Sequence, residues 1–197
     1  MSEAQEIPVA LRVIETHAPR RSWLRAPAPL VVLASITLGA LLLVHFGLRF
    51  MLTPSLPRGI YRTVNGPLVR GAIVVTCLPD SVARFALQRG YLWRGDCPGG
   101  VVPLGKLVLA ISGDTISLSG DGLRLNGRAI RNTRPRKEDS QRRPLTHYPY
   151  GTHVVRPGEI WLFSPYHPLS FDSRYFGPVP SGRVLSRLAP VWTVSER

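Results

Sequence analysis

The sequence predicts a mainly β domain that follows a single N-terminal transmembrane helix. Residues 30–50 form one long apolar run in which Arg49 is the first charge. From residue 70 onward, short runs rich in β-branched residues alternate with Gly, Pro and Asp, which is typical of strands and turns. A chain of 197 residues has room for one such domain plus an anchor.

The apolar run is long enough to cross a membrane, because about 20 apolar residues span a hydrocarbon core of about 30 Å. Gly39 and Gly47 are tolerable in such a helix, and His45 lies near its end, at the interface. A cleaved signal peptide is disfavoured, since its apolar region would be about 7 to 15 residues long and a small-residue cleavage site would follow. We therefore expect a transmembrane helix over 29–50.

The charges before the apolar run predict its orientation. Three arginines lie close to the run, at positions 20, 21 and 25. Because positive residues stay on the cytoplasmic side, we expect residues 1–28 in the cytoplasm and residues 51–197 on the far side of the membrane.

Beyond the membrane, four runs have strand composition: 72–78, 107–111, 115–118 and 160–163. The Asn126-Gly127 pair predicts a hairpin with a type I′ turn, because both positions of that turn need a positive φ. Residues 81–90 are the one short helix that we expect, with Gly90 as its C-terminal stop. Residues 131–151 are predicted to form a long loop.

The charge is strongly positive, +13 for the whole chain, and most of the excess follows the apolar run. Seven basic residues fall within 128–143, interrupted only by Glu138 and Asp139. Such a run can bind nucleic acid, anionic lipid headgroups or an acidic partner. No aromatic residue is interleaved for base stacking, so we expect a solvated loop near phospholipid rather than a nucleic-acid site.

Cys77 and Cys97 are the only cysteines, and both follow the apolar run. In an oxidising compartment they favour one disulfide over two buried thiols. They have no neighbouring histidine and no recognisable zinc spacing, so we expect no metal and no cofactor.

Ser55 lies between Pro54 and Pro57, a few residues after the apolar run. Proline fixes its own φ and restricts the residue before it, which predicts an extended, stiff segment that presents the Ser55 hydroxyl in one direction. An ordinary linker after a membrane anchor explains the same pattern.

Lys106 and Lys137 are the only lysines among 25 basic residues, and Lys137 lies in the arginine-rich loop. Lys106 begins an apolar strand, where desolvation would lower its pKa from about 10.4 toward neutrality. A neutral amine can take the proton of a serine, as in Ser-Lys catalysis. A lysine that merely extends its amine to water at a strand edge is the simpler alternative. None of the five histidines falls in a triad signature.

Three separated segments, 53–57, 106–114 and 170–180, resemble in order the main sequence boxes of type I signal peptidases. Within that family the chain is most similar to the TraF-type peptidases of conjugative transfer systems. The resemblance covers about residues 50–185. It implies a signal-peptidase-like catalytic β-domain in the periplasm, held by one helix in the inner membrane of a bacterium.

The resemblance also implies a role for each matching residue. Ser55 matches the nucleophile and Lys106 the general base, while Thr53 matches a hydroxyl that helps the Ser55 amide form the oxyanion hole. The supporting positions are Ser170, which orients the lysine amine, the charged pair Asp172 and Arg174, and Asp114.

The implied function is a membrane-anchored serine endopeptidase that processes exported precursor proteins. Its substrate would be a conjugative pilin precursor or another transfer-system component, and its partners would be membrane lipid and other conjugation-channel proteins. Some relatives join the ends of the pilin, so cleavage and cyclisation both stay open. The alternative is a non-catalytic, membrane-anchored scaffold of a secretion or conjugation channel.

Overall fold

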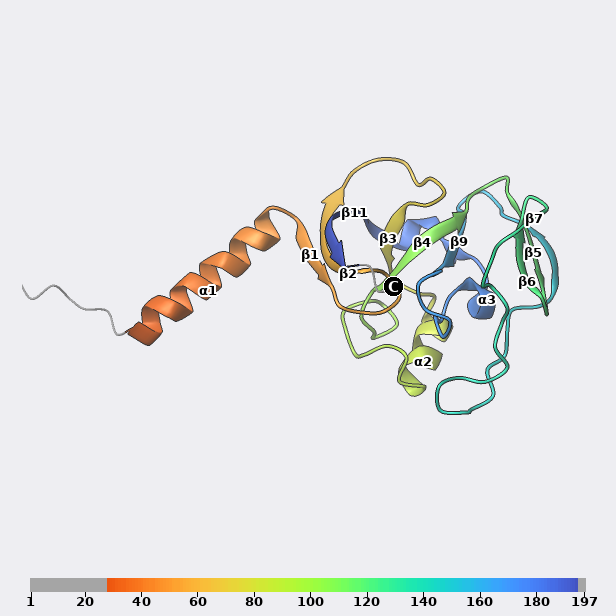
Figure 1. Cartoon of the computed structure of the whole chain (residues 1–197), viewed down its shortest axis with the longest axis horizontal. Helices are drawn as coiled ribbons and strands as arrows, with labels where there is room; N and C mark the ends of the chain where they lie inside the picture. Colours follow the sequence, from red (N-terminus) through yellow and green to blue (C-terminus); the bar gives the residue numbers. More distant parts are fainter. Residues whose placement is uncertain (1–27, 195–197) are drawn as a thin grey trace, which may run out of the picture. The chain divides into compact units, whose positions relative to one another are not determined.

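The computed structural model describes residues 28–194, which belong to two compact units, Met1–Ala40 and Leu41–Arg197. Nearly all of the segment 1–28, which we expect in the cytoplasm, lies outside the described residues. In the second unit, strands predominate and helices are short, so the prediction of a mainly β domain is confirmed (Figure 1).

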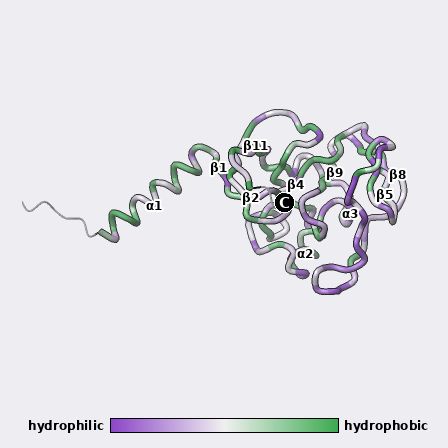
Figure 2. Tube along the Cα trace, in the orientation of Figure 1, coloured by the Kyte–Doolittle hydropathy of each residue, from purple (hydrophilic) through white to green (hydrophobic). Residues whose placement is uncertain are grey.

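Helix α1 (Ala28–His45) is apolar along its length (Figure 2). It ends five residues before the expected boundary at residue 50, because Gly47 has a φ of +66° that a right-handed helix does not continue. Residues 48–50, expected in the helix, instead belong to strand β1 (Leu48–Met51). Among residues 28–194, no helix combines the length and apolarity needed to cross a membrane.

Two antiparallel sheets form the second unit (Figure 1). The larger has the strand order β1-β2-β11-β3-β4-β9-β10, in which the long β11 pairs with both β2 and β3. Its strands after β1 are β2 (Arg58–Val64), β3 (Ile73–Thr76), β4 (Leu104–Ala110), β9 (Glu159–Phe163), β10 (Val179–Pro180) and β11 (Val184–Val194). The smaller sheet has the order β7-β6-β5-β8, formed by β5 (Thr115–Ser119), β6 (Gly122–Leu125), β7 (Arg128–Ala129) and β8 (Gly151–Val154).

Strand β9 separates two apolar cores, and for that reason its residues after Glu159 are all buried. Ile160 and Leu162 pack into one core, whereas Trp161 and Phe163 pack into the other, under the smaller sheet. The first core is covered by α2 (Asp80–Gln88), and the short helices α3 (Ser173–Phe176) and η1 (Ser181–Arg183) follow β9. Because β9 is packed on both faces, the segment that follows it begins at a fixed position.

Several predicted elements are present with small shifts of their ends, namely β3, β4, β5, β9 and α2. Asn126 and Gly127 both have a positive φ, as the predicted hairpin turn requires. Cys77 and Cys97 form the expected disulfide, which joins the end of β3 to the segment before β4. Residues 131–150 form the predicted hydrophilic loop between β7 and β8 (Figure 2).

Candidate active site

Lys106 is the third residue of β4, which begins three residues before the expected strand 107–111. Buried and less buried residues alternate along β4, and Lys106 shares its buried face with Leu104, Val108 and Ala110. Val74 lies opposite Lys106 on the neighbouring strand β3. Only 1% of Lys106 is exposed. The amine therefore lies inside the domain rather than at a strand edge.

This burial lowers the pKa of Lys106 from 10.5 to about 8, because water no longer stabilises the charged form. The Asp172 carboxylate opposes this shift and Arg174 adds to it. The direction agrees with the desolvation that the sequence predicts for this lysine. At a pH near 8, a large share of the molecules carries a neutral amine.

Ser55 lies in a tight turn between β1 and β2, not in the extended segment that its two prolines suggested. The Leu56 amide donates a hydrogen bond to the Thr53 carbonyl at 3.5 Å, so Pro54 occupies the second position of a four-residue turn. The fixed φ of proline suits that position. Leu56 is buried against Gly105, where an added Cβ would lie 3.1 Å from Leu56 Cδ1. The turn is thus packed onto β4 next to Lys106.

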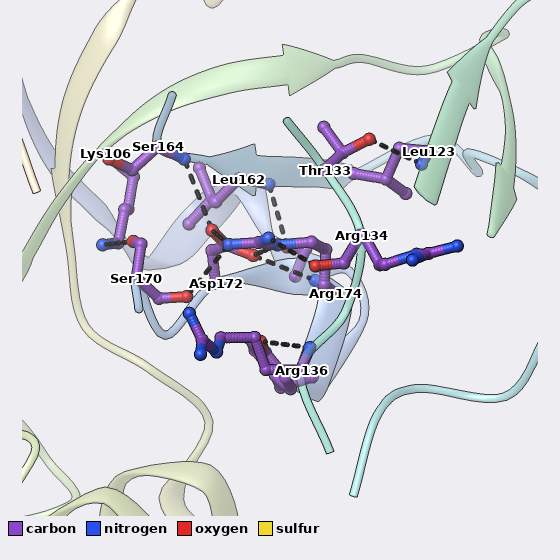
Figure 3. Close-up of polar contacts among 12 residues, drawn as sticks. Lys106, Leu123, Thr133, Arg134, Arg136, Leu162, Ser164, Ser170, Asp172 and Arg174 are labelled. Carbon is purple, nitrogen blue, oxygen red and sulfur yellow. Dashed lines mark hydrogen bonds and ion pairs between the residues drawn. The ribbon is translucent and has the colours of Figure 1, made fainter. Parts of the chain in front are cut away.

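The amine of Lys106 lies between two hydroxyl groups. Its Nζ is 2.6 Å from Ser55 Oγ and 2.5 Å from Ser170 Oγ. Figure 3 shows the Lys106 and Ser170 side chains pointing toward one another. Within residues 28–194, no carboxylate forms an ion pair with Lys106. A neutral amine in this position can accept a proton from Ser55 while it donates a hydrogen bond to Ser170.

Asp172 and Arg174 form a fully buried ion pair behind Ser170 (Figure 3). Arg174 donates from Nε and Nη2 to the two carboxylate oxygens at 2.8 and 2.9 Å, and Nη2 also donates to the Ser170 carbonyl at 3.2 Å. Burial disfavours the charge on Arg174, but the hydrogen bonds and the charge of Asp172 outweigh it and raise the Arg174 pKa. Asp172 also caps α3 by accepting from the Arg174 amide. The pair fixes the backbone that carries Ser170.

Two residues that the sequence analysis did not single out hold the turn of Ser55. The Ser164 hydroxyl donates to the Ser55 carbonyl at 2.6 Å, and the buried Tyr61 hydroxyl donates to the Pro57 carbonyl at 2.7 Å. The Ser164 amide in turn donates to Asp172 Oδ2 at 3.4 Å. A chain of hydrogen bonds therefore joins the backbone of Ser55 to the buried ion pair.

Thr53 and Asp114, the other two predicted site residues, lie in different surroundings. Thr53 is exposed in the turn of Ser55 and lines a cleft that opens at Ser55. Asp114 is buried and accepts hydrogen bonds from the Arg70 guanidinium, the Asn126 amide group and the Ile111 amide, so it holds the connection between β4 and β5. The hydrogen bond from Arg70 is the main reason why the Asp114 pKa is lowered to about 2. None of these partners belongs to the group formed by Ser55, Lys106 and Ser170.

A cleft of about 380 Å³ opens at Ser55. Its walls come from the turn of Ser55, the segment after α2, the start of β4, the loop 131–150 and the segment after β9. The apolar residues that line it include Leu92, Val102, Leu104, Leu145, Leu169 and Phe171. An extended peptide could bind here with its backbone next to the Ser55 hydroxyl.

Comparisons with known proteins show to which family the sequence is similar. A family model described as signal peptidase, peptidase S26, matches residues 20–193. The plasmid transfer protein TraF of Escherichia coli is 35% identical over 148 residues, which are 75% of this chain and 84% of that protein. The conjugal transfer protein TraF of Agrobacterium tumefaciens is 37% identical over 178 residues, which are 88% of this chain and 97% of that protein.

A solved signal peptidase I from Enterococcus faecalis is a more distant match. It is 20% identical, with a TM-score of 0.37, and the match covers 64% of this chain and all of that one. A TM-score this low carries no argument about the family, which is shown by the sequence matches alone.

Proposed function

Because the chain belongs to the signal peptidase family, peptidase S26, we propose that it is a membrane-anchored serine endopeptidase that uses Ser55 and Lys106 to cut exported precursor proteins. The observation that carries this proposal is the distance of 2.6 Å between Lys106 Nζ and Ser55 Oγ, at a lysine whose pKa is lowered to about 8. A neutral amine at hydrogen-bond distance from a hydroxyl is the arrangement that a general base requires.

The proposed reaction begins when Ser55 Oγ attacks the scissile carbonyl and its proton passes to Lys106 Nζ. The negative charge that develops on the carbonyl oxygen is held by the Ser55 amide with help from Thr53. The Lys106 ammonium then gives the proton to the leaving amine as the peptide bond breaks, which leaves an acyl-enzyme on Ser55. Lys106 Nζ next takes a proton from a water molecule, and the oxygen of that water attacks the acyl carbonyl. Lys106 then gives the proton to Ser55 Oγ as the product acid leaves, which restores both residues.

We propose a conjugative pilin precursor, or another component of a transfer system, as the substrate. What supports this is the similarity to two proteins named for plasmid or conjugal transfer. If the substrate's own amine attacked the acyl-enzyme in place of water, the product would be cyclic. Either outcome needs the same first step at Ser55.

We place the protein in the inner membrane of a bacterium, with residues 1–28 in the cytoplasm, an anchor within 29–50 and residues 51–197 in the periplasm. Large apolar side chains of α1 such as Leu30, Ile36 and Leu41 are each more than half exposed. The disulfide between Cys77 and Cys97 suits an oxidising compartment. Recovery of the full chain in the soluble fraction after cell lysis would contradict the anchor.

An apolar face on the second unit gives further support. Phe50 on β1 and Trp192 on β11 both lie opposite Ile60 on β2, so the three side chains form a row across three strands. Phe50 is 56% exposed and Trp192 61% exposed. Exposed aromatic side chains of this kind are typical of surfaces that meet a membrane interface.

The catalytic proposal is tested by Ser55→Ala and Lys106→Met in the full chain, each co-expressed with a candidate pilin precursor. We expect both variants to accumulate unprocessed precursor on a gel, with a rate at least about 10³-fold below wild type, because nucleophile and base act as a unit. Arg128→Met, at an exposed position on β7 away from the cleft, is the matched control and should process normally. Mature product at the wild-type level in either dyad variant would favour the non-catalytic scaffold.

A further inference from the structure

The loop 131–150 is folded around one carboxylate rather than solvated throughout. The Asp139 side chain, 4% exposed, accepts hydrogen bonds from the Tyr91 hydroxyl and Arg143 Nε, both at 2.7 Å, and from the backbone amides of Gln141 and Arg143. Burial alone would raise the Asp139 pKa, but these donors outweigh it and hold the pKa well below its usual range. The charged carboxylate therefore fixes the path of the loop.

The same loop is tied to the catalytic region at two further points. The Arg136 amide donates to the Tyr175 hydroxyl at 3.1 Å, and Arg174 Nη1 donates to the Arg134 carbonyl at 3.4 Å. Tyr175 and Arg174 belong to α3, directly after Ser170 and Asp172. The position of the loop is thus set by the helix that also supports the candidate catalytic lysine.

A hollow of about 1030 Å³ lies between this loop and residues 165–169. Arg136, Lys137 and Arg142 line it with exposed side chains, and no ion pair involves any of these three within residues 28–194. Glu138 is the one exposed carboxylate of the lining. The hollow therefore carries an excess of positive charge that the described part of the chain does not neutralise.

This hollow continues into the cleft at Ser55. Arg136, Ser140, His167 and Leu169 are among the residues that line both. Figure 3 shows the Arg136 side chain extended beneath Ser170 and Asp172 in that view. A peptide whose scissile bond lies at Ser55 would therefore pass directly from the cleft into the basic hollow.

We propose that the basic hollow binds a carboxylate-bearing segment of the precursor, adjacent to the residues held in the cleft. This inference rests on the proposed function and deepens it, since it names a chemical property of the substrate. The loop backbone already has a fixed path before the substrate arrives. Binding therefore needs to order only the three cationic side chains and not the loop that carries them. Such contacts select the substrate and raise its association rate more than they change the chemical step.

The arrangement of the sheet favours a peptide over anionic lipid as the occupant. The exposed row of Phe50 and Trp192 lies on β1 and β11, toward one end of the larger sheet. The hollow is lined by residues that follow β9, at the other end of that sheet, with the loop that leaves β7 (Figure 1). A bilayer that covers the aromatic row would leave the hollow open to a soluble chain segment.

The test measures peptide binding to the full-length Ser55→Ala protein in neutral detergent, so that turnover plays no part. Three labelled peptides share a centre of small residues; one carries four glutamates before it, one carries four glutamates after it, and one carries glutamines at all of these places. We expect one acidic peptide to bind about tenfold more tightly than the glutamine peptide, as a few exposed ion pairs allow. Adding Arg136→Ala, Lys137→Ala and Arg142→Ala should remove this preference.

The matched control removes the same charge from exposed positions outside the hollow, with Arg128→Ala, Arg131→Ala and Arg156→Ala. Equal affinity for all three peptides, or an equal loss in the control variant, would overturn the inference. Loss of binding to phosphatidylglycerol vesicles in the first variant, without a change in peptide affinity, would instead assign the hollow to lipid. Because binding is measured without cleavage, a failure of the proposed function would show separately, as wild-type protein that leaves the precursor intact.

Discussion

The strand around Lys106 and the short helix around Arg174 each bury one cation, and they accommodate it in opposite ways. Arg174 has a carboxylate partner that takes two of its hydrogen bonds, and its pKa is raised despite burial. Lys106 has two hydroxyl groups as partners, and burial lowers its pKa to about 8. The partner, and not burial alone, sets the direction of each pKa shift, and only the lysine amine, whose ordinary pKa is lower, reaches a range in which it loses its proton.

Ser170 connects the two regions. Its hydroxyl is 2.5 Å from Lys106 Nζ, and its carbonyl accepts a hydrogen bond from Arg174 Nη2 at 3.2 Å. The permanently charged region therefore holds in place a hydroxyl next to the amine that titrates. Mutations in either region test whether the two buried cations differ in this way.

The largest effect is expected from Asp172→Asn, which leaves the Arg174 guanidinium charged and buried without its carboxylate. Removing one partner of a buried ion pair typically costs about 3 to 5 kcal/mol of stability. We expect a loss of this size in the free energy of unfolding, measured with urea in detergent. Asp121→Asn, which alters an exposed ion pair with Arg134, is the control and should leave the unfolding midpoint in place. A similar midpoint for Asp172→Asn and wild type would show that the buried pair does not stabilise the domain.

A smaller effect, about 3 kcal/mol, is expected from the titration of Lys106. The amine has a pKa of about 8 in the folded chain and 10.5 in the unfolded chain. Between these two values the unfolded chain holds the proton and the folded one does not, so stability should rise with pH from 8 to 10.5. Below pH 8 the full cost of burying the amine is present.

Lys106→Met isolates this contribution, because all other groups are shared. The difference in unfolding free energy between variant and wild type should favour the variant at pH 7 and shrink as the pH rises to 10. A difference that stays constant over this range would mean that Lys106 keeps an ordinary pKa. In that case almost no molecule would carry a neutral amine near pH 8, and the proposed role of Lys106 as a base would be contradicted.

The smallest effect is expected from Ser164→Ala, which removes the hydrogen bond to the Ser55 carbonyl and leaves the turn of Ser55 less well fixed. A loss of about tenfold in kcat, with KM nearly unchanged, corresponds to about 1.4 kcal/mol of lost positioning. Ser117→Ala, in the smaller sheet, removes a comparable hydroxyl and serves as the control. Unchanged kcat in Ser164→Ala would show that Tyr61 and the packing of Leu56 are sufficient.

Local patterns predicted much of the fold. The strand over 160–163, the hairpin at Asn126-Gly127 and the helix over 81–90 are all present, because each depends on neighbouring residues. The strand β11 was not predicted, since its pairing with β2 and β3 joins segments that are more than a hundred residues apart. The predicted end of α1 was wrong, because Gly47 has a positive φ that ends the helix and the residues after it belong to strand β1.

For the candidate site, the sequence predicted which residues take part better than it predicted how they are arranged in space. The rarity of lysine and the apolar residues after it singled out Lys106, the two flanking prolines singled out Ser55, and family resemblance singled out Ser170, Asp172 and Arg174. The position of Ser164 directly after a buried strand was a usable signal, but only the folded chain shows that its hydroxyl reaches the Ser55 carbonyl. The two prolines predict an extended chain, whereas the hydrogen bond from the Leu56 amide to the Thr53 carbonyl places Pro54 in a turn.

The hydrogen bonds that hold the turn of Ser55 have one more consequence. They come from Ser164 and Tyr61, and the packing comes from Gly105, all within the unit Leu41–Arg197. The proposed nucleophile, Ser55, is therefore oriented by residues that follow it in the chain, even though it lies only ten residues after α1 ends. Replacing the proposed anchor by another apolar segment should therefore leave the contacts that orient Ser55 unchanged.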